Sequence, residues 1–208
     1  MLTARTYVTA FTATLLLAGA GPAMAAPTTG SGQAVAPSAV SHFDDGSFET
    51  PKVEPNTFQE FTAGQHMGPW KVTSGSVDLN DAGYWQAAEG DQSVDLNGME
   101  PGAVAQTFAT TPGVRYTVSY ALAGNPHPEG PTVKTGKVLI DGQDVQDFSF
   151  DVTGKSYKDM GYVMREVAFV ATGKSTTLTF ASTTAPRTAS GPVIDDVTVE
   201  RCKPDCCN

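Results

Sequence analysis

The sequence has little positive charge and no long apolar run. Its 13 Lys and Arg residues are outnumbered by 22 Asp and Glu residues, and the basic residues form no cluster. Because polyanions bind to concentrated positive charge, we exclude nucleic acid and anionic membrane surfaces as partners. The main apolar stretch, Tyr7 to Ala20, is shorter than the roughly 20 residues that cross a bilayer, so we expect no membrane insertion.

The motifs of common catalytic sites are also missing. The sequence contains no Gly-x-Ser-x-Gly, no His-Glu-x-x-His and no phosphate-binding loop. His42, His66 and His127 lie in separate expected loops without the spacing of metal ligands. Carboxylates are numerous, but their number alone does not predict the facing pair that a glycosidase needs. We therefore expect that the protein is not an enzyme.

Cysteine is scarce and confined to the C-terminal tail, residues 202–208, as Cys202, Cys206 and Cys207. In a secreted protein, an odd number of cysteines leaves one thiol over after pairing. We expect one local disulfide, from Cys202 to either Cys206 or Cys207, and a disulfide-linked dimer through the remaining thiol. The tail has neither an LPxTG-type sorting signal nor an apolar anchor, which favours release or cell-wall association.

The N-terminus has the pattern of a secretory signal. Arg5 precedes the apolar stretch, and Ala23 and Ala25 provide small residues where signal peptidase reads them. We interpret residues 1–25 as a signal peptide, with a mature chain that begins near Ala26. Residues 26–40 are small, uncharged residues and Pro, a composition that predicts a disordered linker.

Between residues 41 and 201 the sequence predicts a single β-sandwich domain. Apolar residues alternate with polar ones in short segments separated by Gly and Pro, as in the run from Tyr116 to Leu122. Since a sheet with one apolar face must bury it, we expect two packed antiparallel sheets. Strands are expected near 76–80, 93–97, 104–108, 116–122, 138–140, 145–150, 163–171, 178–180 and 193–199.

Five blocks in this region, in order, resemble a known family. They are DGSFETP at 45–51, GPWKVTSGSVDL at 68–79, WQAAEGDQSVDLNG at 85–98, MGYVMREVAFVATGKSTTLTFAST at 160–183 and GPVIDDVTV at 191–199. The pattern is similar to the bacterial branch of domain of unknown function 642, also called the choice-of-anchor C family. The resemblance implies an all-β, galactose-binding-like jelly roll whose first strand contains Phe43 and Phe48. It supplies no defined activity.

Two aromatic residues in a loop rich in Gly and acidic residues are candidates for sugar binding. Tyr84 and Trp85 lie between two copies of the pentapeptide SVDLN, at 76–80 and 93–97. They either cap the end of the sandwich or form an exposed platform for sugar rings, with Asp and Asn side chains binding the hydroxyls. Trp70, which follows a Gly-Pro turn, is instead assigned to the core. The predicted ligand-binding residues are Tyr84, Trp85, Asp95, Asn97, Asn125 and His127.

A calcium site is implied by a second resemblance. Jelly-roll carbohydrate-binding modules hold Ca²⁺ between the acid of an N-terminal Gly-x-Phe-Glu motif and the Asp of a C-terminal Asp-Asx-Val motif. The matching positions here are Glu49 and Asp195, with Asp45 and Asp196 as additional oxygen ligands. Strand alternation places Asp195 on one face with Val193, Val197 and Val199, where it needs a partner if that face is the core. A backbone N–H group is the alternative to the ion.

These observations predict a secreted, non-catalytic carbohydrate-binding module for cell-wall or extracellular polysaccharide or glycoconjugate. Plant members of the similar family are cell-wall proteins linked to polysaccharide and pectin methylesterase, which implies an extracellular or cell-wall location and a cell-wall protein as a further partner. The alternative is a structural or adhesive protein that binds another protein and no sugar. A polysaccharide hydrolase is the third interpretation and would need two carboxylates facing each other in a cleft.

Overall fold

The computed structural model describes residues 42–185 and 188–202. The predicted signal peptide, the linker and the thiols of Cys206 and Cys207 lie outside these ranges and stay predictions. Within them all regular structure is β, and no helix is long and apolar enough to cross a membrane.

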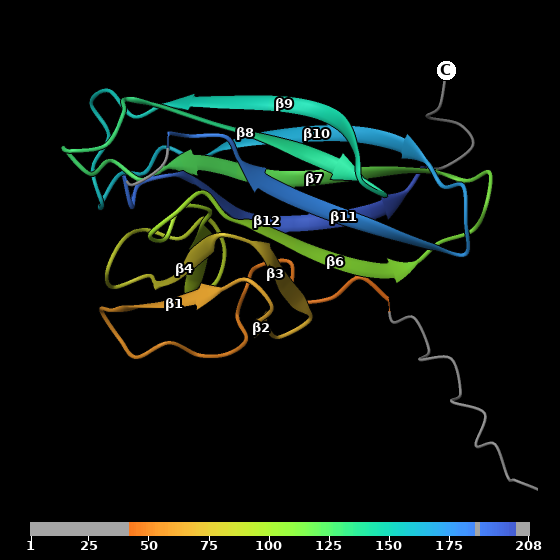
Figure 1. Cartoon of the computed structure of the whole chain (residues 1–208), viewed down its shortest axis with the longest axis horizontal. Coiled ribbons are helices and arrows are strands. Elements are labelled where there is room, and N and C mark those ends of the chain that lie inside the picture. Colours follow the sequence, from red (N-terminus) through yellow and green to blue (C-terminus); the bar gives the residue numbers. More distant parts are fainter. Residues whose placement is uncertain (1–41, 186–187, 203–208) are drawn as a thin grey trace, which may run out of the picture. The chain divides into compact units, whose positions relative to one another are not determined.

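Twelve strands form two six-stranded antiparallel sheets, and the all-β sandwich expected from the sequence is confirmed (Figure 1). The first sheet has the order β1-β4-β5-β12-β7-β10 and the second the order β2-β3-β6-β11-β8-β9. The bounds are β1 Phe58–Thr62, β2 His66–Met67, β3 Trp70–Ser74, β4 Ser76–Asp81, β5 Gln92–Asp95, β6 Ala103–Ala109, β7 Arg115–Gly124, β8 Val133–Ile140, β9 Gln143–Asp151, β10 Val163–Val170, β11 Ser175–Ser182 and β12 Pro192–Arg201.

The core lies between the two sheets and comes from the alternating apolar residues. Val118, Tyr120 and Leu122 of β7 are fully buried, as are Leu178 and Phe180 of β11. Tyr120 and Phe180 meet with ring centroids 4.9 Å apart. This period of two is the reason that the sequence located these strands correctly.

Trp70 belongs to the core, as the sequence predicted. Its indole is fully buried, stacks on Phe48 at a centroid distance of 4.8 Å and meets Phe43 edge-on at 5.7 Å. The indole N–H donates to the carbonyl of Asp45 at 2.8 Å. The expected first strand at Phe43 and Phe48 is wrong, because the backbone turns through positive φ at Asp45 and Phe48. These residues fill the core from a loop, and the first strand begins at Phe58.

A β-bulge in β12 changes the side on which its acidic residues lie. Ile194 pairs with the core residue Leu122, so Asp195, which pairs with Ala121, points to the outer face of the first sheet. The register then shifts between Asp195 and Thr198, around Asp196 with φ 45°. The prediction that Asp195 shares a face with Val197 and Val199 is therefore wrong, because the extra residue reverses the alternation.

Candidate functional site

A pocket of about 340 Å³ lies over the outer face of the first sheet, where β1 and β4 meet the loops after β4, β7, β9 and β11. It brings together four of the six predicted ligand-binding residues, which come from two distant parts of the sequence. Two larger hollows, of about 420 Å³ each, occur elsewhere, but neither joins aromatic rings to carboxylate and amide groups. The pocket is lined by Phe58, Asp78, Asn80, Tyr84, Trp85, Asn125, His127, Glu129, Tyr157, Thr188 and Ala189.

The aromatic wall of the pocket is a cluster of four rings. Tyr84 lies 5.5 Å from Phe58, 5.8 Å from Trp85 and 5.8 Å from Tyr157 between ring centroids. Phe58 and Tyr84 are 48% and 38% exposed, whereas Trp85 is only 2% exposed and donates its indole N–H to Ser93 Oγ at 2.8 Å. Trp85 therefore supports the wall from beneath, and of the two alternatives given for it, its burial fits a covering role in the fold and not an exposed platform. Tyr84 and Phe58 offer the accessible faces.

The two SVDLN copies pair with each other as β4 and β5, with Asp78 opposite Asp95 and Asn80 opposite Ser93. The first copy supplies the lining residues Asp78 and Asn80. The predicted residues Asp95 and Asn97 of the second copy are 1% and 0% exposed and lie outside the lining. The loops after β7 and before β12 cover Asp95, through hydrogen bonds from Asn125 and Gly191, so it supports the pocket instead of lining it.

Asp95 fixes the loops that form the far side of the pocket. Its carboxylate accepts hydrogen bonds from the backbone N–H of Asn97 at 2.8 Å, the backbone N–H of Gly191 at 2.9 Å and the side-chain amide of Asn125 at 2.9 Å. The amide oxygen of Asn125 in turn accepts the backbone N–H of His127 at 3.0 Å. The predicted ligand residues Asn125 and His127 are thus held in place before a ligand arrives.

A buried lysine completes this support. The Lys134 ammonium donates to Ser190 Oγ at 2.5 Å, and the Ser190 hydroxyl donates to the Asn125 carbonyl at 3.0 Å. Burial lowers the pKa of Lys134, while the charge of Asp95 acts in the opposite direction. The network ties the start of β8 to both loops beside the pocket.

Asp78 lines the pocket, and Asp95 lies directly opposite it on β5. Each of these carboxylates raises the free-energy cost of ionising the other. Burial, followed by repulsion from Asp95 and Glu60, raises the pKa of Asp78 to about 7. Burial also raises the pKa of Asp95, to about 6, although its three hydrogen-bond donors lower it. Because Asp95 has donors, we assign the negative charge preferentially to Asp95, and Asp78 takes up the proton first.

Sequence reasoning missed several lining residues. The SVDLN repeat contained a signal for Asp78 and Asn80. The two copies have identical polar residues, so the sequence alone cannot say which copy lines the pocket. Phe58, Glu129, Tyr157, Thr188 and Ala189 had no such signal, because segments far apart in the sequence bring them together.

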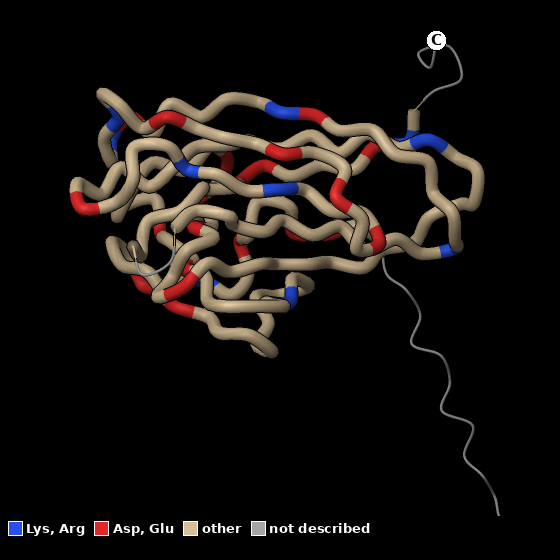
Figure 2. Tube along the Cα trace, turned by 45° about the horizontal axis from the view of Figure 1, so that its top comes forward, with Lys and Arg blue, Asp and Glu red and all other residues tan. Residues whose placement is uncertain are grey.

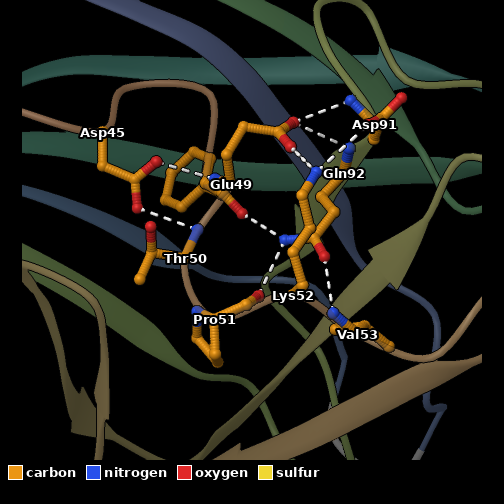
Figure 3. A network of polar contacts seen from close by, with 9 residues as sticks. Asp45, Glu49, Thr50, Pro51, Lys52, Val53, Asp91 and Gln92 are labelled. Carbon is orange, nitrogen blue, oxygen red and sulfur yellow. Dashed lines mark hydrogen bonds and ion pairs between the residues drawn. The ribbon is translucent and has the colours of Figure 1, made fainter.

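The carboxylates predicted to bind calcium instead accept hydrogen bonds from N–H groups. Figure 3 shows Glu49 reaching across to the loop before β5, where one oxygen accepts the backbone N–H groups of Asp91 at 2.7 Å and Gln92 at 2.9 Å. Its other oxygen binds the ammonium of Lys52. The two oxygens of Asp45 accept the backbone N–H groups of Glu49 and Thr50 at 2.7 and 3.1 Å.

Asp195 is bound in the same manner. One oxygen accepts the backbone N–H groups of Ala88 at 2.7 Å and Glu89 at 3.0 Å, and the other accepts that of Asp196 at 2.7 Å. In the part of the chain that the structure describes, no group of three or more His, Cys, Asp or Glu residues could hold a metal ion. This donor set does not fit Ca²⁺, because N–H groups point at the oxygens that the ion would need. The alternative partner for Asp195, a backbone N–H group, is confirmed.

Cys202 follows β12, and its Sγ lies 3.3 Å from Thr117 Oγ1. The predicted pairing with Cys206 or Cys207 concerns residues outside the described ranges.

Lys and Arg residues are distributed among several strands and loops of the described trace (Figure 2).

Comparison with known proteins places the domain in a family. A family model described as protein of unknown function (DUF642) matches residues 41–200. Halomucin of Haloquadratum walsbyi is 32% identical over 131 residues, which are 62% of this chain and 1% of halomucin. The chain thus corresponds to a very small part of that protein.

Solved structures with some similarity include two carbohydrate-binding modules. The CBM22-1 xylan-binding domain of Xyn10C from Paenibacillus barcinonensis is 16% identical with a TM-score of 0.48, over 72% of this chain and 96% of that one. A family 35 carbohydrate-binding module from Clostridium thermocellum is 12% identical with a TM-score of 0.47, over 70% of this chain and 99% of that one. Likenesses of this degree leave the ligand of the present chain to be inferred from its own pocket.

Calcium should leave the melting temperature unchanged, because the oxygens of Glu49 and Asp195 are already satisfied by N–H groups. Thermal unfolding in millimolar calcium and in chelator tests this. Asp195→Ala should destabilise equally in both conditions, since it leaves the N–H groups of Ala88 and Glu89 without an acceptor. A rise in melting temperature with calcium that disappears in Asp195→Ala would contradict this prediction and support a calcium site at Asp195.

Asp78→Asn should stabilise the domain at pH 8 by about 1–3 kcal/mol, and the gain should shrink towards pH 5. The folded-state pKa of Asp78 lies above its unfolded value. The destabilisation caused by ionising Asp78 in the folded state is therefore absent below about pH 4, grows as pH rises and is complete above about pH 7. Denaturant unfolding of both proteins at several pH values measures it, with the exposed Glu200→Gln as control. A gain that does not vary with pH would show that Asp78 ionises normally.

Proposed function

The chain belongs to the DUF642 family. We propose that it is a secreted, non-catalytic module of the galactose-binding-like jelly-roll type, which binds extracellular or cell-wall polysaccharide in the pocket beside Tyr84. The observation that carries this proposal is the convergence of exposed aromatic rings with carboxylate, amide and imidazole groups in one concavity. Its volume of about 340 Å³ is in the lower part of the range of small-ligand sites.

The chemistry of the lining suits a sugar. The C–H faces of a pyranose ring pack on aromatic rings, and Tyr84, Phe58 and Tyr157 provide these faces at the mouth of the pocket. The hydroxyl groups around the same ring need donors and acceptors at its edge. Asp78, Asn80 and His127 supply both kinds.

The carboxylates of the pocket give little support for hydrolysis. A glycosidase needs two accessible carboxyl groups on opposite sides of the scissile bond. Asp95, the partner of Asp78 on the neighbouring strand, is buried and accepts three hydrogen bonds, so it cannot reach a substrate. Glu129 also lines the pocket, but it is an exposed loop residue, and among the described residues no hydrogen bond holds its carboxylate in a fixed position opposite Asp78.

Adhesion to another protein is the second candidate, and one surface favours it. Val163, Met164 and Val170 of β10 are 39%, 57% and 52% exposed, and β10 is an edge strand of the first sheet. Exposed apolar side chains on an unpaired edge are typical of contact surfaces. This surface lies on a different strand from the pocket, so the two functions can be tested separately.

Polysaccharide retention should depend on the exposed rings of the pocket. Tyr84→Ala should weaken binding about 2- to 10-fold, because it removes an exposed stacking face and leaves the core intact. Tyr157→Ala should weaken binding by a similar factor and also lower stability, because its ring packs partly against the core. A glycan array with the wild-type protein selects the ligand, and affinity electrophoresis or calorimetry compares the variants. Trp85→Ala should instead lower stability, because it empties a buried site.

Met164→Ala serves as the control, since it changes an exposed apolar residue of β10 and should leave glycan retention intact. Reducing ends should not accumulate during prolonged incubation with the bound polysaccharide. Sustained turnover would overturn the non-catalytic assignment. Retention that survives both tyrosine changes but is lost in Met164→Ala would move the binding site to β10.

A further inference from the structure

Asp78 differs from the other shielded carboxylates of the domain in its lack of a hydrogen-bond donor. Asp45, Glu49, Asp95 and Asp195 each accept at least two backbone N–H groups. Within residues 42–185 and 188–202, no group donates to the Asp78 carboxylate, although this residue is partly buried and lines the pocket. Because a shielded carboxylate without a donor is costly, its partner is expected to arrive with the ligand.

The charges around this carboxylate have its own sign. Asp95 lies directly opposite on β5, Glu60 of β1 adds to the repulsion, and Glu129 lines the same pocket. Among the described lining residues there is no Lys or Arg, and Lys134 directs its ammonium towards Ser190. A pocket with this field attracts a cation and repels the carboxylate of a uronic acid.

The aromatic rings add a second interaction that favours a cation. Tyr84 is at the centre of a cluster with Phe58 and Tyr157, and the centroid distances of 5.5 and 5.8 Å place the rings side by side along one wall. Aromatic faces attract ammonium groups through the negative potential above the ring. They also pack against the C–H groups of a sugar, so one wall can hold both parts of an amino sugar.

We propose, on the basis of the function proposed above, that the glycan carries a protonated amine, as a de-N-acetylated amino sugar does, and that Asp78 binds this ammonium group. The ammonium supplies the donor that Asp78 lacks and offsets its repulsion with Asp95. Since burial and Asp95 raise the pKa of Asp78 to about 7, a bound ammonium group would lower it again, and binding of an amine that is already protonated would release the proton of Asp78.

The test compares two oligosaccharides that differ in one group. Oligomers of glucosamine and of N-acetylglucosamine, of equal length, are titrated into the full chain by calorimetry at about pH 5.5, low enough to protonate an amine whose pKa is depressed by neighbouring oxygens. The glucosamine oligomer should bind at least about 10-fold more tightly. Asp78→Asn should weaken its binding about 10- to 100-fold. It should weaken binding of the N-acetylated oligomer much less, because Asn keeps donor and acceptor atoms for the sugar hydroxyl groups. An oligomer of a uronic acid should bind most weakly.

Two control variants make the result specific. Glu200→Gln removes an exposed carboxylate at the far end of β12 and should change neither affinity. Arg187→Ala removes a cationic side chain outside the described residues; in the sequence, Arg187 immediately precedes the lining residue Thr188. If Arg187→Ala strengthens binding of the glucosamine oligomer by more than about 10-fold, Asp78 has an internal partner and the proposal fails.

The remaining outcomes separate this inference from the proposed function. Equal affinity for both oligomers, tighter binding of the uronic acid oligomer, or an Asp78→Asn variant that binds like the wild type would overturn the role of the ammonium group. Polysaccharide binding that depends on Tyr84 would survive any of these results. If the wild-type protein retains no glycan on an array, both the module and its amine preference are refuted.

Discussion

Backbone N–H groups of the loop before β5 donate to two carboxylates from opposite ends of the domain sequence. Glu49 binds the N–H groups of Asp91 and Gln92, and Asp195 binds those of Ala88 and Glu89. These bonds hold the loop over the outer face of the first sheet, where Trp85 also donates to Ser93. The pocket depends on this arrangement, because the loop carries Tyr84 and Trp85 and the sheet beneath it carries Asp78.

The same constraint explains why one carboxylate is left for a ligand. Charged side chains on a covered sheet face must find donors or stay protonated. Asp95 and Asp195 find theirs in neighbouring loops, whereas Asp78 lies where the covering segments separate and the pocket opens. Support and recognition are therefore divided between residues of the same type. Their position relative to the loops, and not their chemistry, decides which role each one has.

The sequence was sufficient for most of the fold and for four of the eleven described residues that line the pocket. Alternation located the strands from Ser76 onwards and assigned Trp70 to the core, because both depend on local spacing. The two SVDLN copies pointed to a shared polar face, but the loops that cover Asp95 on the second copy decide that the first copy lines the pocket. Phe58 and Tyr157 meet Tyr84 through long-range packing that no local pattern encodes. The bulge at Asp196 likewise reversed a face that strict alternation had assigned.

The most direct test of the account is to locate the glycan on the domain by NMR. Amide spectra of the labelled protein are recorded during titration with the polysaccharide fragment that the array selects. The account predicts that the largest shifts occur around Asp78, Tyr84, Asn125 and Tyr157, with Asp95 affected through its hydrogen bonds. Shifts confined to the exposed threonines of the second sheet, such as Thr107 and Thr177, or to the hollow beside Arg201, would contradict it.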